Sequence, residues 1–304
     1  MNVVETSGLG KRYRKTWALR DCTLAVPAGH VVALVGPNGA GKTTLLHCAV
    51  GLSTATTGSV TVLGDLTAGS LDALERVAFV AQDAPSHRHL SVGAMVGVAA
   101  NLNHRFDVEQ AKARLAALEI PLHRKVGKLS GGQQAQLALA LALARHPDLL
   151  VLDEPVARLD PLARHDFMAL VVSAVAEEGV SVLFSSHVVS ELERVADYLI
   201  LLAHGRVQMA GAIDDLLAGH ALWSGPVDEA GAVSERLSVV QSQQAGRYAQ
   251  LLVRTGTKAQ APSGWESVDV SLEELVLAYL RQPSVTTLPG PLNLMALSST
   301  EVTA

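Results

Sequence analysis

The sequence predicts an α/β fold in which a largely parallel sheet forms the core of one large domain. Apolar runs at residues 149–152 and 180–184 suit the central strands of such a sheet. A long helical pattern after Pro161 lies between them, which is the order of a βαβ unit. With 304 residues, of which 49% are apolar and 17% charged, the chain can form this core and one smaller domain.

The other elements of the large domain follow in order along residues 1–219. Residues 31–35 form a β-prone run that ends at a glycine, and a helix is expected over residues 42–50. Residues 59–63 and 77–80 are expected to be further strands. Residues 198–202 and 207–209 predict a short hairpin that turns at His204 and Gly205.

Three regions differ from this alternation. Residues 85–144 have helical periodicity, as at 108–118, which predicts a helical insertion. Residues 220–282 contain a strand pattern at 248–253 and a helix start of capping-box form at Ser271 and Glu274, so a small C-terminal α+β domain is expected. Residues 283–304 contain three prolines amid Ser, Thr and Gly, and this composition predicts a disordered tail.

Composition limits the classes of function. The net charge of −5 gives no reason to expect nucleic-acid binding, because such binding needs a basic surface. The sequence has neither a recognisable secretory signal nor an apolar run long enough to cross a bilayer, so we expect a cytoplasmic chain that reaches a membrane only through a partner. Cys22 and Cys48 lack a metal-binding spacing and are expected to be small buried hydrophobic residues.

Residues 36–43, Gly-Pro-Asn-Gly-Ala-Gly-Lys-Thr, match the pattern G-x-x-x-x-G-K-[ST] between a predicted strand and a predicted helix. Glycines let the backbone wrap around phosphate oxygens, and the amides at the helix start face the anion. The expected phosphate-binding loop consists of Gly36, Pro37, Asn38, Gly39, Ala40, Gly41, Lys42, Thr43 and Thr44. Lys42 is expected to reach the β- and γ-phosphates, and the Thr43 hydroxyl to bind Mg²⁺. The alternative is a glycine-rich turn that matches by chance.

Two carboxylates, Asp153 and Glu154, directly follow the apolar run at residues 149–152. Parallel strands present their carboxyl ends at the edge of the sheet where ligands bind. Asp153 is expected to hold the water shell of Mg²⁺, and Glu154 to orient a water that attacks the γ-phosphate. The alternative is a solvated loop after a core strand.

Residues 129–133, Leu-Ser-Gly-Gly-Gln, predict a helix start with Ser130 as N-cap and Gln133 as its capping-box partner. A helix N-terminus with a hydroxyl group and two glycines also offers an unobstructed anion site. The same residues therefore have a structural and a functional interpretation.

Together these motifs resemble those of the nucleotide-binding subunits of ABC transporters. Residues 36–43 are similar to the phosphate loop of the family, residues 129–133 to its signature sequence, and Asp153 and Glu154 to its acidic strand end. Four further residues match the family in its order. Tyr13 is similar to an aromatic residue that stacks on adenine, and Gln82 to a glutamine that touches Mg²⁺ and water and senses the membrane partner. Asp160 is similar to the aspartate of the next loop, and His187 to a histidine that contacts the γ-phosphate. The resemblance covers residues 1 to about 219.

Several of these residues also have a simpler interpretation. Trp17 competes with Tyr13 for the stacking role, Gln82 alone would be a loop amide, and His187 alone would be a histidine at a helix start. Asp160 precedes Pro161 and is a good N-cap, so we expect it both to cap the helix and to lie near a dimer interface.

The resemblance implies a P-loop NTPase core with a parallel sheet, an antiparallel β subdomain and the helical insertion. It implies ATP hydrolysis, with ATP and Mg²⁺ as cofactors. Thr43, Gln82 and Asp153 would lie at the metal, and Lys42, Gln82, Glu154 and His187 would act in catalysis. It also implies a head-to-tail dimer, most simply of two copies of this chain, in which Ser130, Gly131, Gly132 and Gln133 of one subunit face the ATP of the other.

The implied partner is a polytopic membrane permease, which would hold the chain at the inner face of the cell membrane. The helical insertion and the loop at Gln82 are the expected contact. The segment after Gly219 resembles the C-terminal extensions of bacterial exporter ATPases, so export is the predicted direction. The chain departs from the family at residues 134–136, where arginines are common, and at Arg158, where a small residue is usual, and both changes could tune dimer contact or slow turnover.

Two other functions fit part of the sequence. The main alternative is a non-transport ABC ATPase that acts on ribosomes or DNA, although this chain has one cassette and no sustained heptads. The other is a binding or regulatory role without hydrolysis, against which stands the full set of catalytic residue types.

Overall fold

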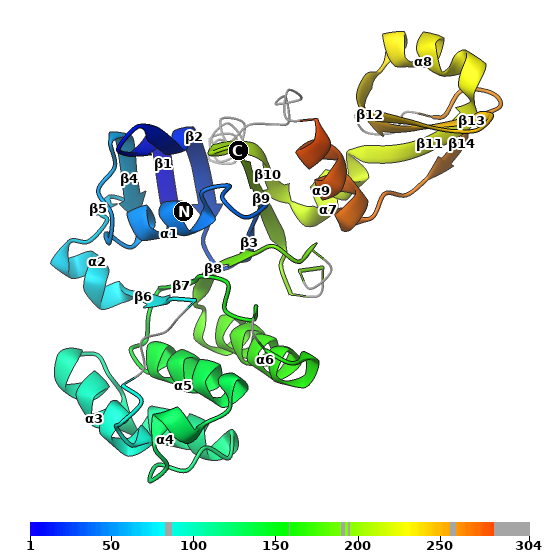
Figure 1. The fold of residues 1–304 in the computed structure, drawn as a ribbon. Coiled ribbons are helices and arrows are strands. Elements are labelled where there is room, and N and C mark those ends of the chain that lie inside the picture. Colours follow the sequence, from blue (N-terminus) through cyan, green and yellow to red (C-terminus); the bar gives the residue numbers. More distant parts are fainter. Residues whose placement is uncertain (83–86, 158, 190–191, 194, 256–259, 283–304) are drawn as a thin grey trace, which may run out of the picture.

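A computed structural model describes residues 1–82, 87–157, 159–189, 192–193, 195–255 and 260–282. The predicted tail at 283–304 and Arg158 lie outside these residues. The described chain contains a mostly parallel sheet, an antiparallel sheet beside it, a helical region and a C-terminal segment (Figure 1). The predicted α/β fold with these parts is therefore confirmed.

The central sheet has the strand order β10-β9-β3-β8-β7-β6. Its strands are β3 (Val31–Val35), β6 (Val77–Val80), β7 (Leu149–Leu152), β8 (Ser181–Ser186), β9 (Tyr198–Ala203) and β10 (Arg206–Ala212). All neighbours are parallel except β9 and β10, which form the predicted hairpin. Every residue of β3, β7, β8 and β9 is buried, as expected for strands that are covered on both faces.

The register of the central sheet gathers its carboxyl ends at one edge. Val35 of β3 pairs with Ser186 of β8, and Leu152 of β7 pairs with Phe184 of β8. The residues that follow these strands are consequently neighbours in space, although they are far apart in the sequence.

The antiparallel sheet has the order β2-β1-β4-β5 and consists of β1 (Asn2–Tyr13), β2 (Thr16–Pro27), β4 (Thr57–Val62) and β5 (Leu66–Thr67). Only β4 has a counterpart among the strands predicted individually. Buried side chains on β1 and β2, such as Leu9 and Leu24, belong to the same apolar cluster as Leu34 of the central sheet. Helix α1 (Lys42–Ala49) contributes Leu45 and Leu46 to that cluster.

Helices cover the other face of the central sheet. Helix α6 (Pro161–Glu178) begins at the N-cap Asp160, whose carboxylate accepts hydrogen bonds from the amides of Leu162 and Ala163. It ends at Gly179, which has a φ of 69° and permits a left-handed C-cap. Helix α2 (Leu71–Arg76) precedes β6, and its buried Ala73 belongs to the cluster on the α1 side of the sheet.

The helical region contains α3 (Val92–Leu102), α4 (Val108–Ala117), a 3₁₀ turn (Val126–Lys128) and α5 (Gly131–Leu143). The N-caps are Ser91, Asp107 and Ser130, each with a side chain that accepts an amide hydrogen bond. These helices form their own apolar cluster, and they lie together below the central sheet in the view of Figure 1.

The C-terminal segment begins with α7 (Ile213–Ala218) and forms a second antiparallel sheet of order β12-β13-β11-β14. Its strands are β11 (His220–Pro226), β12 (Ser238–Ala245), β13 (Tyr248–Arg254) and β14 (Glu266–Val268), and α8 (Ala230–Arg236) follows a 3₁₀ turn (Val227–Glu229). Helix α9 (Leu272–Arg281) starts at the capping box of Ser271 and Glu274. The sequence had indicated only β13 and α9.

Helix α9 links this segment to the large domain. Its Leu272, Leu275 and Tyr279 belong to one apolar cluster with Leu201 of β9 and Met209 of β10. In Figure 1, α9 lies beside α7, between the central sheet and the C-terminal sheet. The predicted boundary after Gly219 therefore falls within continuous apolar packing.

Candidate functional site

The loop between β3 and α1 depends on its glycines. Gly39 and Gly41 have φ values of 81° and 108°, which residues with a Cβ rarely adopt. A Cβ at Gly36 would lie 2.1 Å from the carbonyl oxygen of Leu202, and one at Gly41 would lie 2.6 Å from that of Ala18. Helix α1 starts directly at Lys42, and no side chain caps it. Its first amides therefore have no partner within the helix and can bind an anion.

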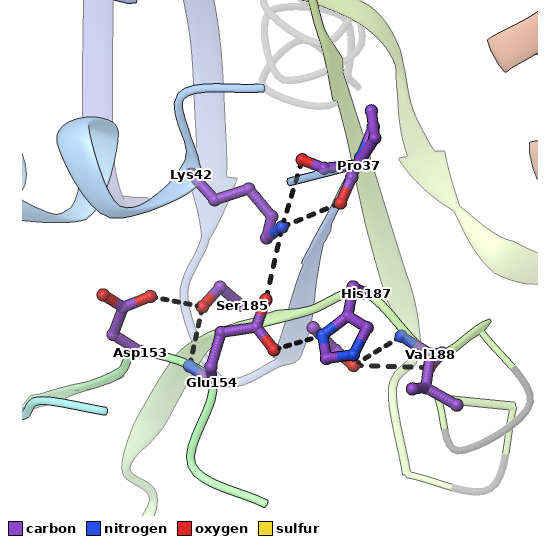
Figure 2. A network of polar contacts seen from close by, with 9 residues as sticks. Pro37, Lys42, Asp153, Glu154, Ser185, His187 and Val188 are labelled. Atoms are coloured by element: carbon purple, nitrogen blue, oxygen red, sulfur yellow. Dashed lines mark hydrogen bonds and ion pairs between the residues drawn. The ribbon is translucent and has the colours of Figure 1, made fainter. Parts of the chain in front are cut away.

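Lys42 points back across this loop. Its side chain is mostly buried, and its Nζ donates hydrogen bonds to the carbonyl oxygens of Gly36 at 2.7 Å and Pro37 at 3.4 Å. The same Nζ lies 3.2 Å from Oε1 of Glu154. The lysine is thus held by the loop and by the acidic strand end together (Figure 2).

Glu154 occupies a strained position immediately after β7. Its φ is 47°, in the left-handed region that non-glycine residues seldom adopt. Its Oε2 lies 2.7 Å from Nδ1 of His187, while its Oε1 faces Lys42. Both carboxylate oxygens are therefore engaged, each with a basic side chain from another part of the chain.

Asp153, which is 3% exposed, lies deeper than Glu154. Its Oδ1 accepts a hydrogen bond of 2.7 Å from the hydroxyl of Ser185 on β8. The same hydroxyl oxygen accepts the amide of Glu154 at 2.8 Å. One serine on the neighbouring strand thus contacts both acidic residues.

His187 follows β8 in a short turn. The hydroxyl of Ser186 accepts the amide of Val188 at 3.0 Å and lies 3.3 Å from the Val188 carbonyl oxygen. This local bonding fixes the backbone around His187, whose exposed side chain points to Glu154 (Figure 2).

A cavity of about 400 Å³ brings most of the predicted residues together. Its lining residues are Tyr13, Ala18, Asn38, Gly39, Ala40, Gly41, Lys42, Thr43, Thr44, Gln82, Glu154 and His187. Tyr13 lines this cavity, whereas its rival Trp17 does not. Gly36, Pro37 and Asp153 do not line it either. The carbonyl oxygens of Gly36 and Pro37 accept hydrogen bonds from Lys42, which does, and Asp153 directly precedes Glu154 in the chain.

The signature residues lie elsewhere, at the start of α5. The capping box of Ser130 and Gln133 is complete, with bonds of 3.1 and 3.2 Å. Ser130 and Gly131 are exposed, while Gly132 is buried. Gly132 packs closely on α6, since a Cβ at this position would lie 2.7 Å from the Cβ of Ala163. Neither residues 130–133 nor Asp160 line the cavity. Within this chain, these predicted residues are therefore not brought to the phosphate loop.

Two residues of the site were not predicted. Ala18 lines the cavity from β2, and no sequence signal marks it. Ser185 belongs to none of the motifs that the sequence shows. The signal that could have revealed its role is its place at the end of β8, because polar residues that end a buried parallel strand lie near the site.

Comparison with known proteins finds two family models and several relatives that match this chain. A family model described as ABC transporter matches residues 19–157, and one described as AAA domain, putative AbiEii toxin, Type IV TA system, matches residues 124–193. The molybdenum import ATP-binding protein ModC of Pseudomonas aeruginosa is 36% identical over 240 residues, which cover 75% of this chain and 66% of that protein. The thiamine import ATP-binding protein ThiQ of Salmonella typhimurium is 35% identical over 204 residues, which cover 66% of this chain and 87% of that protein.

Solved structures agree with these relatives. The ATP-binding subunit of an ABC transporter superposes with a TM-score of 0.63 at 28% identity and covers 70% of this chain and 91% of its own. A dimeric ATP-binding cassette in a post-hydrolysis state, bound to ADP and phosphate, gives a TM-score of 0.62 at 25% identity and covers 69% of this chain and 98% of its own.

Proposed function

Because the chain belongs to the ABC transporter family of ATP-binding proteins, we propose that it binds ATP and hydrolyses it to ADP and phosphate to drive a membrane transporter. The observation that carries this proposal is the cavity that joins the phosphate loop to Glu154 and His187. The three segments come from β3, β7 and β8, and their contacts form one chain from Lys42 through Glu154 to His187.

Phosphate binding would depend on the loop and on Lys42. The unpaired amides at the start of α1 favour an anion, and the ammonium group of Lys42 adds a positive charge beside them. A γ-phosphate in the loop would compete with Glu154 for this ammonium group. The carboxylate would then be released from Lys42 and could act on a water molecule.

Glu154 would orient and deprotonate the attacking water. Its carboxylate is mostly buried, and His187 holds one of its oxygens. His187 itself is substantially exposed at the mouth of the cavity, where it could contact the γ-phosphate. These are the positions that a general base and its partner require.

The residues fit Mg²⁺, which prefers oxygen ligands. Thr43 and Gln82 line the cavity and offer a hydroxyl and an amide oxygen, and the buried Asp153 offers a carboxylate whose Oδ1 is already held by Ser185. Bound Mg²⁺ would neutralise charge that develops on the phosphate oxygens. The residues of this chain would hold it through Thr43, Gln82 and the water shell at Asp153.

We further propose that two cassettes pair head to tail. Ser130 and Gly131 are exposed at the N-terminus of α5, and Asp160 is exposed at that of α6. The close packing of Gly132 on Ala163 brings these two helix starts together. One solved relative of this fold is a dimer bound to ADP and phosphate. A second copy could present this surface to the open cavity of the first.

A membrane permease is the proposed partner, and a second cavity of about 600 Å³ is its proposed docking groove. Apolar residues such as Leu71, Leu74 and Leu102 line this groove and are exposed, while Arg105 and Arg145 lie at one side. Of the helices in the described residues, none is long and apolar enough to cross a membrane. In this proposal, contact between the permease and this groove holds the chain at the inner face of the membrane.

Strand β6 connects the two cavities. Its Val77 and Phe79 line the groove, and Gln82, two residues after the strand, lines the nucleotide cavity. A displacement of Gln82 on ATP binding or hydrolysis would thus reach the groove through a short, buried strand. This supports the coupling role that the resemblance implies for Gln82.

The predicted direction, export, receives no support from the relatives, because both are named for import. Their similarity covers 75% and 66% of this chain. The comparisons favour import. The alternative function on ribosomes or DNA is supported by no feature of the site.

Two measurements test the proposal. Phosphate release by the purified chain should require both ATP and Mg²⁺, and a chain that neither binds nor hydrolyses ATP would contradict it. A pull-down from solubilised membranes with ATP, read by mass spectrometry, should recover a polytopic membrane protein in stoichiometric amount. Recovery of ribosomal or DNA-bound proteins without a membrane protein would favour the non-transport alternative.

A further inference from the structure

Ser185 lies where β8 reaches the carboxyl edge of the central sheet, beside the two carboxylates that follow β7. Its side chain is 0% exposed. Its hydroxyl oxygen is 2.7 Å from Oδ1 of Asp153 and 2.8 Å from the amide nitrogen of Glu154. Figure 2 shows this single hydroxyl between the two acidic residues.

The direction of the two hydrogen bonds is determined by chemistry. The amide of Glu154 can only donate, so the Ser185 oxygen accepts from it. The hydroxyl hydrogen is then free to be donated to the carboxylate of Asp153. The hydroxyl therefore both accepts and donates a hydrogen bond, and each bond holds a different one of the two acidic residues.

The bond to the amide of Glu154 acts on a strained backbone. A left-handed φ at a non-glycine residue is energetically unfavourable and persists only when its surroundings enforce it. The φ of 47° directs the Glu154 carboxylate towards Lys42 and His187. Loss of the Ser185 hydroxyl would remove one of the contacts that enforce this turn.

We infer that Ser185 is a positioning residue for the hydrolysis of ATP. This inference rests on the proposed function and adds a residue to it. Ser185 fixes the Asp153 carboxylate by occupying Oδ1, and it fixes the Glu154 carboxylate through the backbone. It touches neither the nucleotide nor the attacking water itself, since it does not line the cavity.

The test compares two serines of the same strand. Ser181 is also buried on β8, but its hydroxyl accepts the amide of Gly29 at 2.9 Å and lies at the other end of the strand. Ser185→Ala and Ser181→Ala each remove one buried hydroxyl, so a loss of stability is expected in both. Only Ser185→Ala should lower kcat, by about 10- to 100-fold, as is typical when a residue that orients a metal-site carboxylate is removed.

Two further readouts separate positioning from a general structural effect. The affinity for ATP measured without Mg²⁺ should be unchanged in Ser185→Ala, because the phosphate loop is intact. The Mg²⁺ concentration that gives half-maximal activity should rise. Ser185→Thr keeps a hydroxyl and should recover most of the kcat, and Ser185→Cys, which is nearly isosteric, should be intermediate and serves if the alanine variant does not fold.

The inference is overturned if Ser185→Ala and Ser181→Ala share the wild-type kcat and Mg²⁺ dependence. If the wild-type chain binds nucleotide but does not hydrolyse it, the proposed hydrolysis is refuted and the proposed nucleotide binding stands. The role of Ser185 is then decided by the Mg²⁺ dependence of binding of a non-hydrolysable ATP analogue, which should weaken in Ser185→Ala and not in Ser181→Ala. Equal dependence in both overturns the inference, and a wild-type chain that binds no nucleotide overturns it together with the proposed function.

Discussion

At the scale of single residues, the contacts of Glu154 explain how its carboxylate is held in one orientation. Lys42, whose Nζ also donates to a carbonyl oxygen of the phosphate loop, faces one oxygen, and His187 faces the other. The pair of Lys42 and Glu154 is mostly buried, where removing one charge leaves the other uncompensated. A substitution of Lys42 or Glu154 therefore changes both the stability of the fold and the rate of hydrolysis. A variant that keeps the shape of the side chain is needed to separate the two effects.

Glu154→Gln should retain ATP binding and lose nearly all turnover. The amide keeps the shape of the side chain and can still accept from Lys42, but it cannot take a proton from water. Removing a general base lowers kcat by about 10²- to 10⁴-fold. Binding of a fluorescent ATP analogue and release of phosphate measure the two properties separately. A variant with the wild-type rate would show that Glu154 is not the base.

At the scale of elements, the sequence predicts most clearly the strands that are buried on both faces. Residues 77–80 and 149–152 were predicted with the same limits that β6 and β7 have in the structure. Residues 149–152 form a strand inside the sheet that is covered on both faces, for which continuous apolar side chains are typical, and residues 77–80 form the edge strand of the same sheet. The phosphate loop and the acidic strand end were predictable for a related reason, because each is a short motif attached to such a strand.

The elements that sequence reasoning missed have weaker local patterns. Strand β2 reads Thr-Trp-Ala-Leu-Arg-Asp-Cys-Thr-Leu-Ala-Val-Pro, with register shifts against β1 that break a strict alternation of buried and exposed residues. Strand β12 has mostly polar residues and owes its position to pairing with β13. Similarly, Ala18 and Ser185 belong to the site only through tertiary packing, which no local motif records.

Helix α5 offers a prediction at this scale, because its capping serine has a second proposed role. Ser130→Ala should lower the free energy of unfolding by about 1 kcal/mol through loss of the N-cap bond. It should also abolish ATP-dependent association of two cassettes, which size-exclusion chromatography of the Glu154→Gln background would detect. Ser91→Ala is the matched control, since Ser91 caps α3 in the same way and lies outside the proposed interface. Equal association in both variants would contradict the head-to-tail arrangement.

At the scale of the whole molecule, the two cavities are proposed to serve different partners, so their roles should be separable by mutation. Leu74→Asp places a charge in the larger groove, where Leu74 is 49% exposed. Recovery of the membrane protein in pull-downs should fall sharply, because a carboxylate would have to be desolvated at the interface. ATP hydrolysis by the isolated chain should not change.

Val172→Asp provides the control for that experiment. Val172 is 41% exposed on α6, and it does not line the groove. Its variant should bind the membrane partner as the wild type does. If both variants lose the partner equally, the groove is not the docking site.

The junction between the large domain and the C-terminal sheet should make stability depend on pH. His220 is 5% exposed, and its Nδ1 donates to the carbonyl oxygen of Leu216 at 2.6 Å, which leaves Nε2 to accept from the hydroxyl of Tyr279 at 2.9 Å. Burial lowers the pKa of His220 below its ordinary value of 6.5, and the nearby Arg254 lowers it further. The folded state thus disfavours the charged form.

Because the pKa of His220 is lowered by folding, its contribution to the free energy of unfolding is complete above pH 6.5 and decreases as the pH falls below that value. The loss should not exceed about 1.4 kcal/mol per pH unit. Urea unfolding at several pH values should show this slope in the wild type and a smaller one in His220→Gln, which is neutral throughout. Identical slopes would exclude His220 as the source.

The packing of α9 into the apolar cluster of the central sheet has a consequence for the synthesis of the protein. During translation, the phosphate loop, the acidic strand end and His187 all leave the ribosome before Leu272 and Tyr279, which complete that cluster. Until α9 emerges, the nascent cassette carries an unfilled apolar surface of the kind that chaperones recognise. A message cut short before codon 272 would therefore encode every residue that lines the nucleotide cavity and still yield a chain prone to aggregation and degradation.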